Sequence, residues 1–363
     1  VIPQDSSSEE EQLRTTKAAE IVSQGVSIID AGTWQSSGLN GSGVKLAVID
    51  GGFKGYSTLL GSELPATVQV NAQGSASKLD SNVHGTACAE IIHDVAPDAS
   101  LYLVRAETDV ELGMAKDWCK TQGVKIISHS MNYFVGPFDG TGQVNDIVSD
   151  AVNYGITWVN SAANQAQSHW SGNFSDTNGD IYHNFMPDDE VNYMMNSNFG
   201  DSISVYMTWN DPWGYSSNDY DLLIVRQTPF SIVGVSETRQ NGNDDPIEIY
   251  SFYPLSGVFY GFGIGKYAAA TKKLHVFAPN YVLQYQTAAS SLGIPADNEK
   301  VISVGAVAWS SPSVIEDFSS RGPTVDGRTK PDLVAPDGVS TVSYGTTPFY
   351  GTSASCPHVA GAS

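Results

Sequence analysis

Three short motifs place an acid, a base and a nucleophile along this chain. Asp50 follows the apolar run VKLAVI and precedes two glycines, His84 opens HGTACAEIIH, and Ser353 lies in GTSASCPHVAG. A serine hydroxyl is a weak nucleophile, so hydrolysis needs a histidine base, and that base needs a carboxylate to orient it. The three residue types therefore predict hydrolysis through a covalent intermediate.

Each motif alone has a simpler explanation as a turn residue, a structural histidine or a helix cap. The order acid, base, nucleophile favours catalysis, because this order differs between unrelated serine hydrolase folds. The chain resembles the subtilisin-like serine proteases (subtilase family, peptidase family S8) in five ordered segments: VKLAVIDGG, NVHGTACAEII, PADNEKVISVGAVA, DFSSRGPTVDGRTKPDLVAP and GTSASCPHVAG.

The resemblance implies a serine endopeptidase that hydrolyses peptide bonds and assigns a role to each matched position. Asp50 would orient the imidazole, His84 would act as the base and Ser353 as the nucleophile. Asn164 would share the oxyanion with the backbone N–H of Ser353. The residue before the scissile bond would bind in a pocket with two walls. The backbone of the first wall would pair antiparallel with the substrate peptide, and the second wall would lie opposite the first. These walls are Ser130, Met131 and Asn132, and Ser161, Ala162 and Ala163.

Some positions depart from the subtilase pattern. Asn132 and Ala163 stand where the family usually has glycine, so both walls are bulkier and we predict no preferred side chain. Ser355 and Cys356 replace the commoner Ala-Ser pair. The string GTSAS is similar to the sedolisins, which use Glu, Asp and Ser at acidic pH. The complete HGT motif and the asparagine at position 164 favour the subtilase interpretation.

Alternating strands and helices would position these residues. Apolar runs typical of buried strands lie at 44–49, 100–105, 125–131, 156–162 and 301–308. Helical patterns lie between them at 84–96, 110–123 and 144–155. This alternation predicts an α/β fold, a parallel sheet with helices on both faces. We assign the catalytic domain to residues 23–168 and 288–363 and an N-terminal arm or linker remnant to residues 1–22.

Residues 169–287 have a different pattern. Alternating aromatic and polar residues with frequent turns are typical of antiparallel strands. We therefore predict an inserted β-sandwich that interrupts the catalytic domain. The segment NDPWGYSSNDYDLLIV (210–225) resembles a strand pair of the pre-peptidase C-terminal type of β-sandwich.

The overall charge limits the partners. With 18 basic and 39 acidic residues the net charge is −21, which repels phosphate backbones and argues against nucleic acid. No apolar run approaches the about 20 residues that a membrane span needs. Three cysteines exclude a disulfide scaffold, and with the acidity they suit a secreted protein. We expect polypeptide substrates and, as the family implies, an own propeptide before maturation.

Two features leave alternatives open. Asp176, Asn178 and Asp180 have the alternating oxygen spacing of a calcium loop, but Ile181 occupies the position where such loops need glycine, so a solvated turn is the alternative. The chemistry itself requires no cofactor. Cys88 lies one helical turn after His84 and resembles the cysteine beneath the histidine in some subtilases; its alternative is a buried small residue.

The C-terminal motif raises a further expectation. From Pro357 the predicted helix has seven residues, too short to be stable alone. We expect the C-terminal part of the catalytic domain to be missing from this chain or supplied by a separate chain. A catalytically restricted or non-catalytic binding protein remains the alternative function, because a fold alone does not establish activity.

Overall fold

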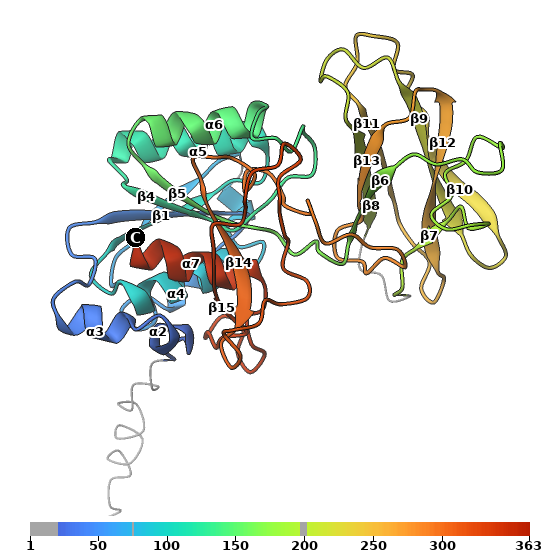
Figure 1. Cartoon of the computed structure of the whole chain (residues 1–363). Helices are drawn as coiled ribbons and strands as arrows, with labels where there is room; N and C mark the ends of the chain where they lie inside the picture. The colour runs from blue at the N-terminus through green and yellow to red at the C-terminus, as the bar shows by residue number, and fades with distance from the viewer. Residues whose placement is uncertain (1–20, 75, 197–201) are drawn as a thin grey trace, which may run out of the picture.

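A seven-stranded parallel sheet forms the centre of the larger domain (Figure 1). The computed structural model describes residues 21–74, 76–196 and 202–363, so all but the end of the predicted arm 1–22 lies outside it. The order of the strands across the sheet is β15-β14-β5-β4-β1-β3-β2. Their bounds are β1 (Lys45–Asp50), β2 (Gln69–Ala72), β3 (Ser100–Arg105), β4 (Ile126–His129), β5 (Thr157–Ser161), β14 (Ile302–Ala308) and β15 (Leu333–Asp337).

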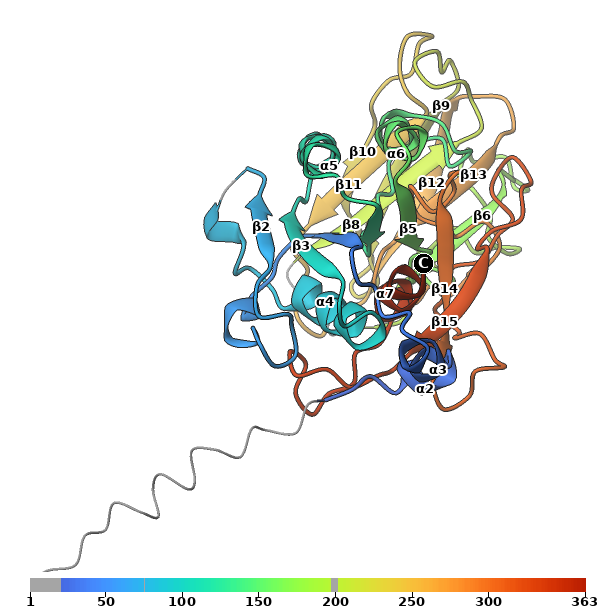
Figure 2. The ribbon, with the colours of Figure 1, turned by 90° about the vertical axis from the view of Figure 1, so that its left-hand side faces the viewer.

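Helices cover both faces of this sheet (Figure 2). Helices α4 (His84–Val95) and α7 (Thr352–Ala362) share one apolar core with the sheet, and α5 (Asp109–Gln122) and α6 (Gln143–Asn153) share the other. This arrangement confirms the predicted α/β fold. The shorter elements are α2 (Gly25–Ile28), α3 (Ala31–Ser36), η1 (Tyr56–Thr58) and η2 (Ala76–Lys78).

The central strand β1 shows why an apolar run forms a strand here. Side chains alternate between the two faces of a strand. Leu46 and Val48 point into the core shared with α4 and α7, and Ala47 and Ile49 into the core shared with α5 and α6. Because both faces are covered, every residue of β1 after the exposed Lys45 is buried. The run ends at Asp50, at the carboxyl edge of the sheet.

The inserted module is a sandwich of two antiparallel sheets beside the catalytic domain (Figure 1). Within the described residues the sheet orders are β10-β9-β12-β7 and β11-β8-β13-β6. The core between them takes side chains from both, including Met207 and Val276 from one sheet and Leu222 and Phe262 from the other. The strands are β6 (His169–Asn173), β7 (Asn192–Tyr193), β8 (Ile203–Trp209), β9 (Asp219–Arg226), β10 (Ser231–Ser236), β11 (Ile247–Phe252), β12 (Tyr260–Ala268) and β13 (Lys273–Phe277).

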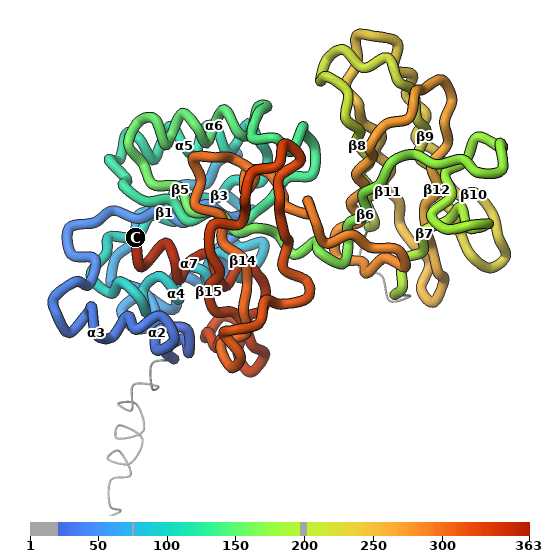
Figure 3. Tube along the Cα trace, viewed as in Figure 1, coloured from blue at the N-terminus to red at the C-terminus, as the bar shows by residue number. Residues whose placement is uncertain are grey.

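The chain enters the insert after β5 and returns from it before β14 (Figure 3). The strands of the two antiparallel sheets lie between His169 and Phe277, inside the predicted range 169–287. The exact domain limits stay a prediction. No helix of the described residues is long and apolar enough to cross a membrane.

The sequence-based start of the last helix was wrong. Helix α7 begins at Thr352, with Pro357 inside it. Proline has no N–H and cannot bond the carbonyl four residues earlier, here that of Ser353. The freed Ser353 carbonyl accepts hydrogen bonds from Ser130 Oγ at 3.2 Å and from Cys88 Sγ at 3.5 Å. These side chains satisfy the group that proline leaves open, so the helix continues through it. The expectation of a missing C-terminal part stays a prediction.

Candidate active site

Asp50 and His84 form a close pair at the carboxyl edge of the sheet. Asp50 Oδ2 lies 2.7 Å from His84 Nδ1, and Asp50 Oδ1 accepts the backbone N–H of Gly51 at 2.8 Å. The Asp50 side chain is 2% exposed and the His84 side chain 27%. The carboxylate is thus fixed and buried, whereas the imidazole keeps one side open to solvent.

The surroundings of His84 favour its protonated form. Burial lowers the pKa of His84, but the charge of Asp50 and the hydrogen bond to it outweigh that effect, so the pKa lies above its usual 6.5. The Phe349 ring meets the imidazole edge-on, with the ring centroids 5.4 Å apart. This packing and the aspartate restrict how the ring can turn.

Ser353 lies in the first turn of α7, close to α4. Its backbone carbonyl is 3.5 Å from the sulfur of Cys88, one turn beyond His84 on α4. The hydroxyl of Ser353 donates to the Ser130 carbonyl at 3.2 Å, and no hydrogen bond in the described part of the chain joins it to the imidazole. Catalytic hydrogen bonds are often long in a free enzyme, and rotation about one side-chain bond redirects a serine hydroxyl.

Asn164 lies beside the start of α7. Its Oδ1 accepts from the backbone N–H of Thr352 at 3.0 Å and from the Thr352 hydroxyl at 2.9 Å. These bonds identify the opposite amide atom, Nδ2, as the one left to donate. Gly351 has φ 112°, and a Cβ there would lie 3.0 Å from Nδ2. Its N–H donates to Asp337 at 2.8 Å, which fixes this turn. A glycine is therefore needed at position 351.

The two predicted pocket walls lie side by side. Asn132 Nδ2 donates to Ser161 Oγ at 2.9 Å, so the extra bulk of Asn132 connects one wall to the other. Asn160, which the sequence did not single out, donates to the carbonyls of Met131 at 3.2 Å and Ser161 at 2.9 Å. Its polar side chain in the buried run ITWVNSA was the available signal. The Asn160 side chain thus connects the backbones of the two walls by hydrogen bonds.

The other two residues of the second predicted wall, Ala162 and Ala163, follow directly after β5. Ala162 donates its N–H to Val304 in the neighbouring strand at 2.8 Å and is fully buried. Ala163 has φ 82°, a backbone conformation that costs free energy for any residue with a side chain. Glycine adopts this conformation without that cost, in agreement with the glycine that the resemblance to subtilases leads us to expect at this position.

The buried cysteines are not placed to react. Cys88, Cys119 and Cys356 are free thiols with no exposed surface. Burial raises the pKa of Cys88 well above its usual range, with smaller contributions from Asp50 and Cys356, so the thiol stays neutral. Asp50, His84 and Cys88 form the one cluster of metal-ligand types found in the described residues. Their potential ligand atoms lie within 4.8 Å of one another, but Asp50 and His84 already bond to each other.

The predicted calcium loop is closed by its own hydrogen bonds. Asp176 accepts the backbone N–H groups of Gly179, Asp180 and Ile181 at 2.7, 3.2 and 3.0 Å. Asn178 donates to Asp180 at 2.9 Å. Ile181 takes φ 76°, the conformation for which calcium loops use glycine. Calcium binding here stays a prediction.

Comparisons with known proteins identify the family. The subtilase family model matches residues 41–219 and 257–363, more than half of the chain. Serine protease AprX of Bacillus subtilis strain 168 is 47% identical over 58 residues, 15% of this chain and 13% of that protein. The alkaline protease of Alkalihalobacillus alcalophilus is 27% identical over 173 residues, 43% of each. The chain therefore spans less than half the length of the curated relatives it matches.

The fold has a close counterpart among solved structures. The Clostridium perfringens CspB protease superposes with a TM-score of 0.61 over 91% of this chain and 84% of that chain, at 17% identity. Identity at this level shows a common fold. The sheet, the five ordered motifs and the family match together show that the chain belongs to the subtilase family.

Proposed function

We propose that the protein is a serine endopeptidase in which Ser353 attacks the scissile carbonyl. The observation that carries this proposal is the buried Asp50 carboxylate 2.7 Å from His84 Nδ1, on a helix that packs against the helix of Ser353. A carboxylate at this nitrogen keeps the proton on Nδ1 and leaves Nε2 free to accept the serine proton.

The reaction follows from these positions. Ser353 Oγ forms a bond to the carbonyl carbon while its proton passes to His84 Nε2. The negative oxygen receives hydrogen bonds from Asn164 Nδ2 and from the Ser353 N–H, which has no partner within the first turn of a helix. His84 then gives its proton to the leaving amine, and the C–N bond breaks. Water, activated by His84, releases the acyl group.

Polypeptides are the proposed substrates. The edge segment Ser130, Met131 and Asn132 would add the peptide as an antiparallel strand, opposite Ser161, Ala162 and Ala163. A propeptide and secretion are part of this proposal as well; the sparse cysteines and the acidic charge support secretion.

Active-site substitutions test the proposal. We expect Ser353→Ala and His84→Ala each to remove nearly all hydrolysis of casein, and the double variant to lose little more, because the groups act as a unit. A fluorophosphonate should label the parent protein on Ser353 alone, detected by peptide mass mapping. Full activity of Ser353→Ala, or strictly additive losses, would refute the shared mechanism.

A non-catalytic role is the second candidate. It is favoured by one observation, the Ser353 hydroxyl bonded to the Ser130 carbonyl instead of His84. A properly folded parent protein that neither cleaves casein nor reacts with a fluorophosphonate, but binds casein, would favour that role over catalysis.

A further inference from the structure

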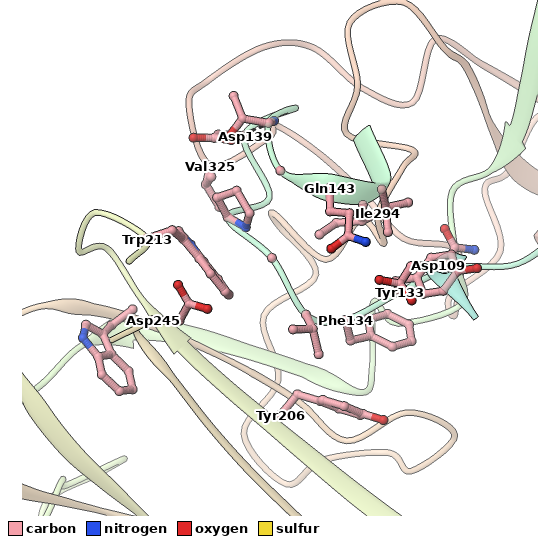
Figure 4. A pocket seen from close by; sticks show the side chains of 18 of the residues that line it. Asp109, Tyr133, Phe134, Asp139, Gln143, Tyr206, Trp213, Asp245, Ile294 and Val325 are labelled. Atoms are coloured by element: carbon pink, nitrogen blue, oxygen red, sulfur yellow. Dashed lines mark hydrogen bonds between the residues drawn. The ribbon is translucent and has the colours of Figure 1, made fainter. Parts of the chain in front are cut away.

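A pocket of about 1110 Å³ lies between the catalytic domain and the inserted sandwich (Figure 4). The catalytic domain lines it with residues 107–109 at the start of α5, residues 132–137, Asp139, residues 141–144, Ile294 and residues 325–326. The insert contributes Tyr206 and Trp209 of β8, the loop residues 210–213, and Asp245. Neither domain forms this pocket alone.

The lining combines aromatic rings with carboxylates. Five aromatic side chains and six acidic residues line the pocket, and no lysine, arginine or histidine does. The aromatic residues are Tyr133, Phe134, Tyr206, Trp209 and Trp213, and the acidic ones are Glu107, Asp109, Asp139, Asp211, Asp245 and Asp326. A cation is attracted both by ring faces and by carboxylates, so this lining fits a cationic side chain.

Three of these carboxylates are not neutralised. Glu107, Asp211 and Asp326 pair with Arg105, Lys272 and Arg328, respectively. Asp109, Asp139 and Asp245 form no ion pair among the described residues. Each accepts one backbone N–H within its own domain, and Asp139 also accepts the Thr141 hydroxyl. Their charge is therefore available to a ligand.

Hydrogen bonds to Asp211 and to Asp245 fix the loop of the insert that carries Trp213. Asp211 accepts from the side chains of Ser216 at 3.0 Å and Asn218 at 2.7 Å. Asp245 Oδ1 accepts the N–H of Gly214 at 2.8 Å, which ties the loop to the start of β11. Figure 4 shows Trp213 and Asp245 together on the insert side, across from Asp139 and Gln143. The sequence motif that resembles a β-sandwich strand pair thus presents a half-buried tryptophan to the catalytic domain.

The pocket continues the proposed path of the substrate. The hydroxyl of Ser353 lies at Ser130, so the scissile bond lies at that end of the edge segment. In a peptide that pairs antiparallel with residues 130–132, the residues before the scissile bond lie along this segment from Ser130 toward Asn132. Asn132 is itself part of the pocket lining. Because one strand residue pairs with one peptide residue, the pocket is reached from about the fourth residue before the bond onward.

We propose that this pocket is a distal substrate subsite that selects a lysine or arginine side chain, with Trp213 and Asp245 as specificity-determining residues of the insert. The proposal rests on the proposed endopeptidase function and gives the insert a part in it. The protein would prefer basic segments several residues before the cleavage site, and the net charge of −21 would favour their approach.

Synthetic peptides test this subsite in the active full-length protein. In a series of hexapeptide anilides, the three residues next to the scissile bond are kept constant. The fourth, fifth or sixth residue before the bond is lysine, leucine or glutamate. The matching tripeptide ends before the pocket. We expect lysine at one of these positions to raise kcat/KM about tenfold over glutamate. Trp213→Ala and Asp245→Asn should each reduce this ratio to about threefold or less, while kcat/KM for the tripeptide changes less than about twofold.

The controls come from the same loops. Asp245→Asn keeps an oxygen for the Gly214 N–H and removes only the charge. Tyr215→Ala removes an exposed ring that does not line the pocket and should leave the ratio unchanged. Equal rates for lysine and glutamate, or an undiminished ratio in both pocket variants, would overturn the subsite while the tripeptide still reports an active protease. A parent protein that fails on the tripeptide would overturn the proposed function together with the subsite.

Discussion

Asp50→Asn is the substitution for which the structure gives the clearest expectation. Oδ1 of Asp50 accepts the Gly51 N–H at 2.8 Å, so the asparagine oxygen will take that place and its NH₂ group will face His84. An NH₂ group cannot accept the Nδ1 proton. The imidazole must therefore carry its proton on Nε2, where it can no longer accept the proton of Ser353.

The size of the effect follows from two terms. At an effective dielectric constant of about 20, opposite charges about 4 Å apart attract by about 4 kcal/mol, which corresponds to about 10³ in rate for a charge that forms on His84 in the transition state. The wrong tautomer adds about another factor of ten. We expect kcat to fall about 10⁴-fold, the size known for this substitution in an Asp-His-Ser triad.

The pH profile provides a second readout. In the parent protein the acidic limb of kcat/KM should lie above pH 6.5, because Asp50 raises the pKa of His84 and protonated His84 is no base. Without the charge of Asp50, burial remains and lowers the pKa, so the limb should shift to lower pH. Measurements with one chromogenic peptide between about pH 5 and 9 check this.

A matched control separates the site from general charge effects. Asp98 is exposed and bonded to Asn40, so Asp98→Asn should change neither rate nor profile. A loss below about tenfold in Asp50→Asn, or an acidic limb that does not move, would refute our account of the Asp50–His84 pair.

Four other outcomes are expected. Asn164→Leu should lower kcat about 10²–10³-fold with little change in KM, and a loss under threefold in steady-state kinetics would contradict an oxyanion role. Gly351→Ala should lower both activity and melting temperature, because its φ of 112° costs a side chain about 1–3 kcal/mol; calorimetry showing no shift would contradict this. Burial lowers the pKa values of five histidines, to about 4 for four of them and well below the usual 6.5 for His275: His129, His169, His183, His275 and His358. The folded state therefore binds fewer protons than the unfolded one, so the stability measured with urea should fall as the pH drops from about 6.5 to 4, and a constant stability over this range would contradict their burial. If the loop 176–180 binds calcium, chelation should lower the melting temperature of the parent protein but not of Asp180→Asn.

Much of the catalytic domain follows from local sequence. The apolar run of β3 was predicted at its observed bounds and that of β14 within one residue, because strands buried on both faces read as continuous apolar runs. The edge strand β2 was missed: it is partly exposed, and its pairing partner β3 lies beyond helix α4 along the chain. Strand pairing is not local, so such segments carry little signal.

The sequence by itself determined which chemistry we propose for this chain, since Asp50, His84 and Ser353 occur in short motifs with a characteristic order. Tertiary structure decided how those groups are held. Only the packing of α7 against α4 and against the end of β4 brings Cys88 and Ser130 to the Ser353 carbonyl that Pro357 leaves free. Likewise, only the docking of the insert places Trp213 opposite residues 132–137. These contacts join segments far apart along the chain, and their free energy depends on the packing of whole domains, which no local pattern records.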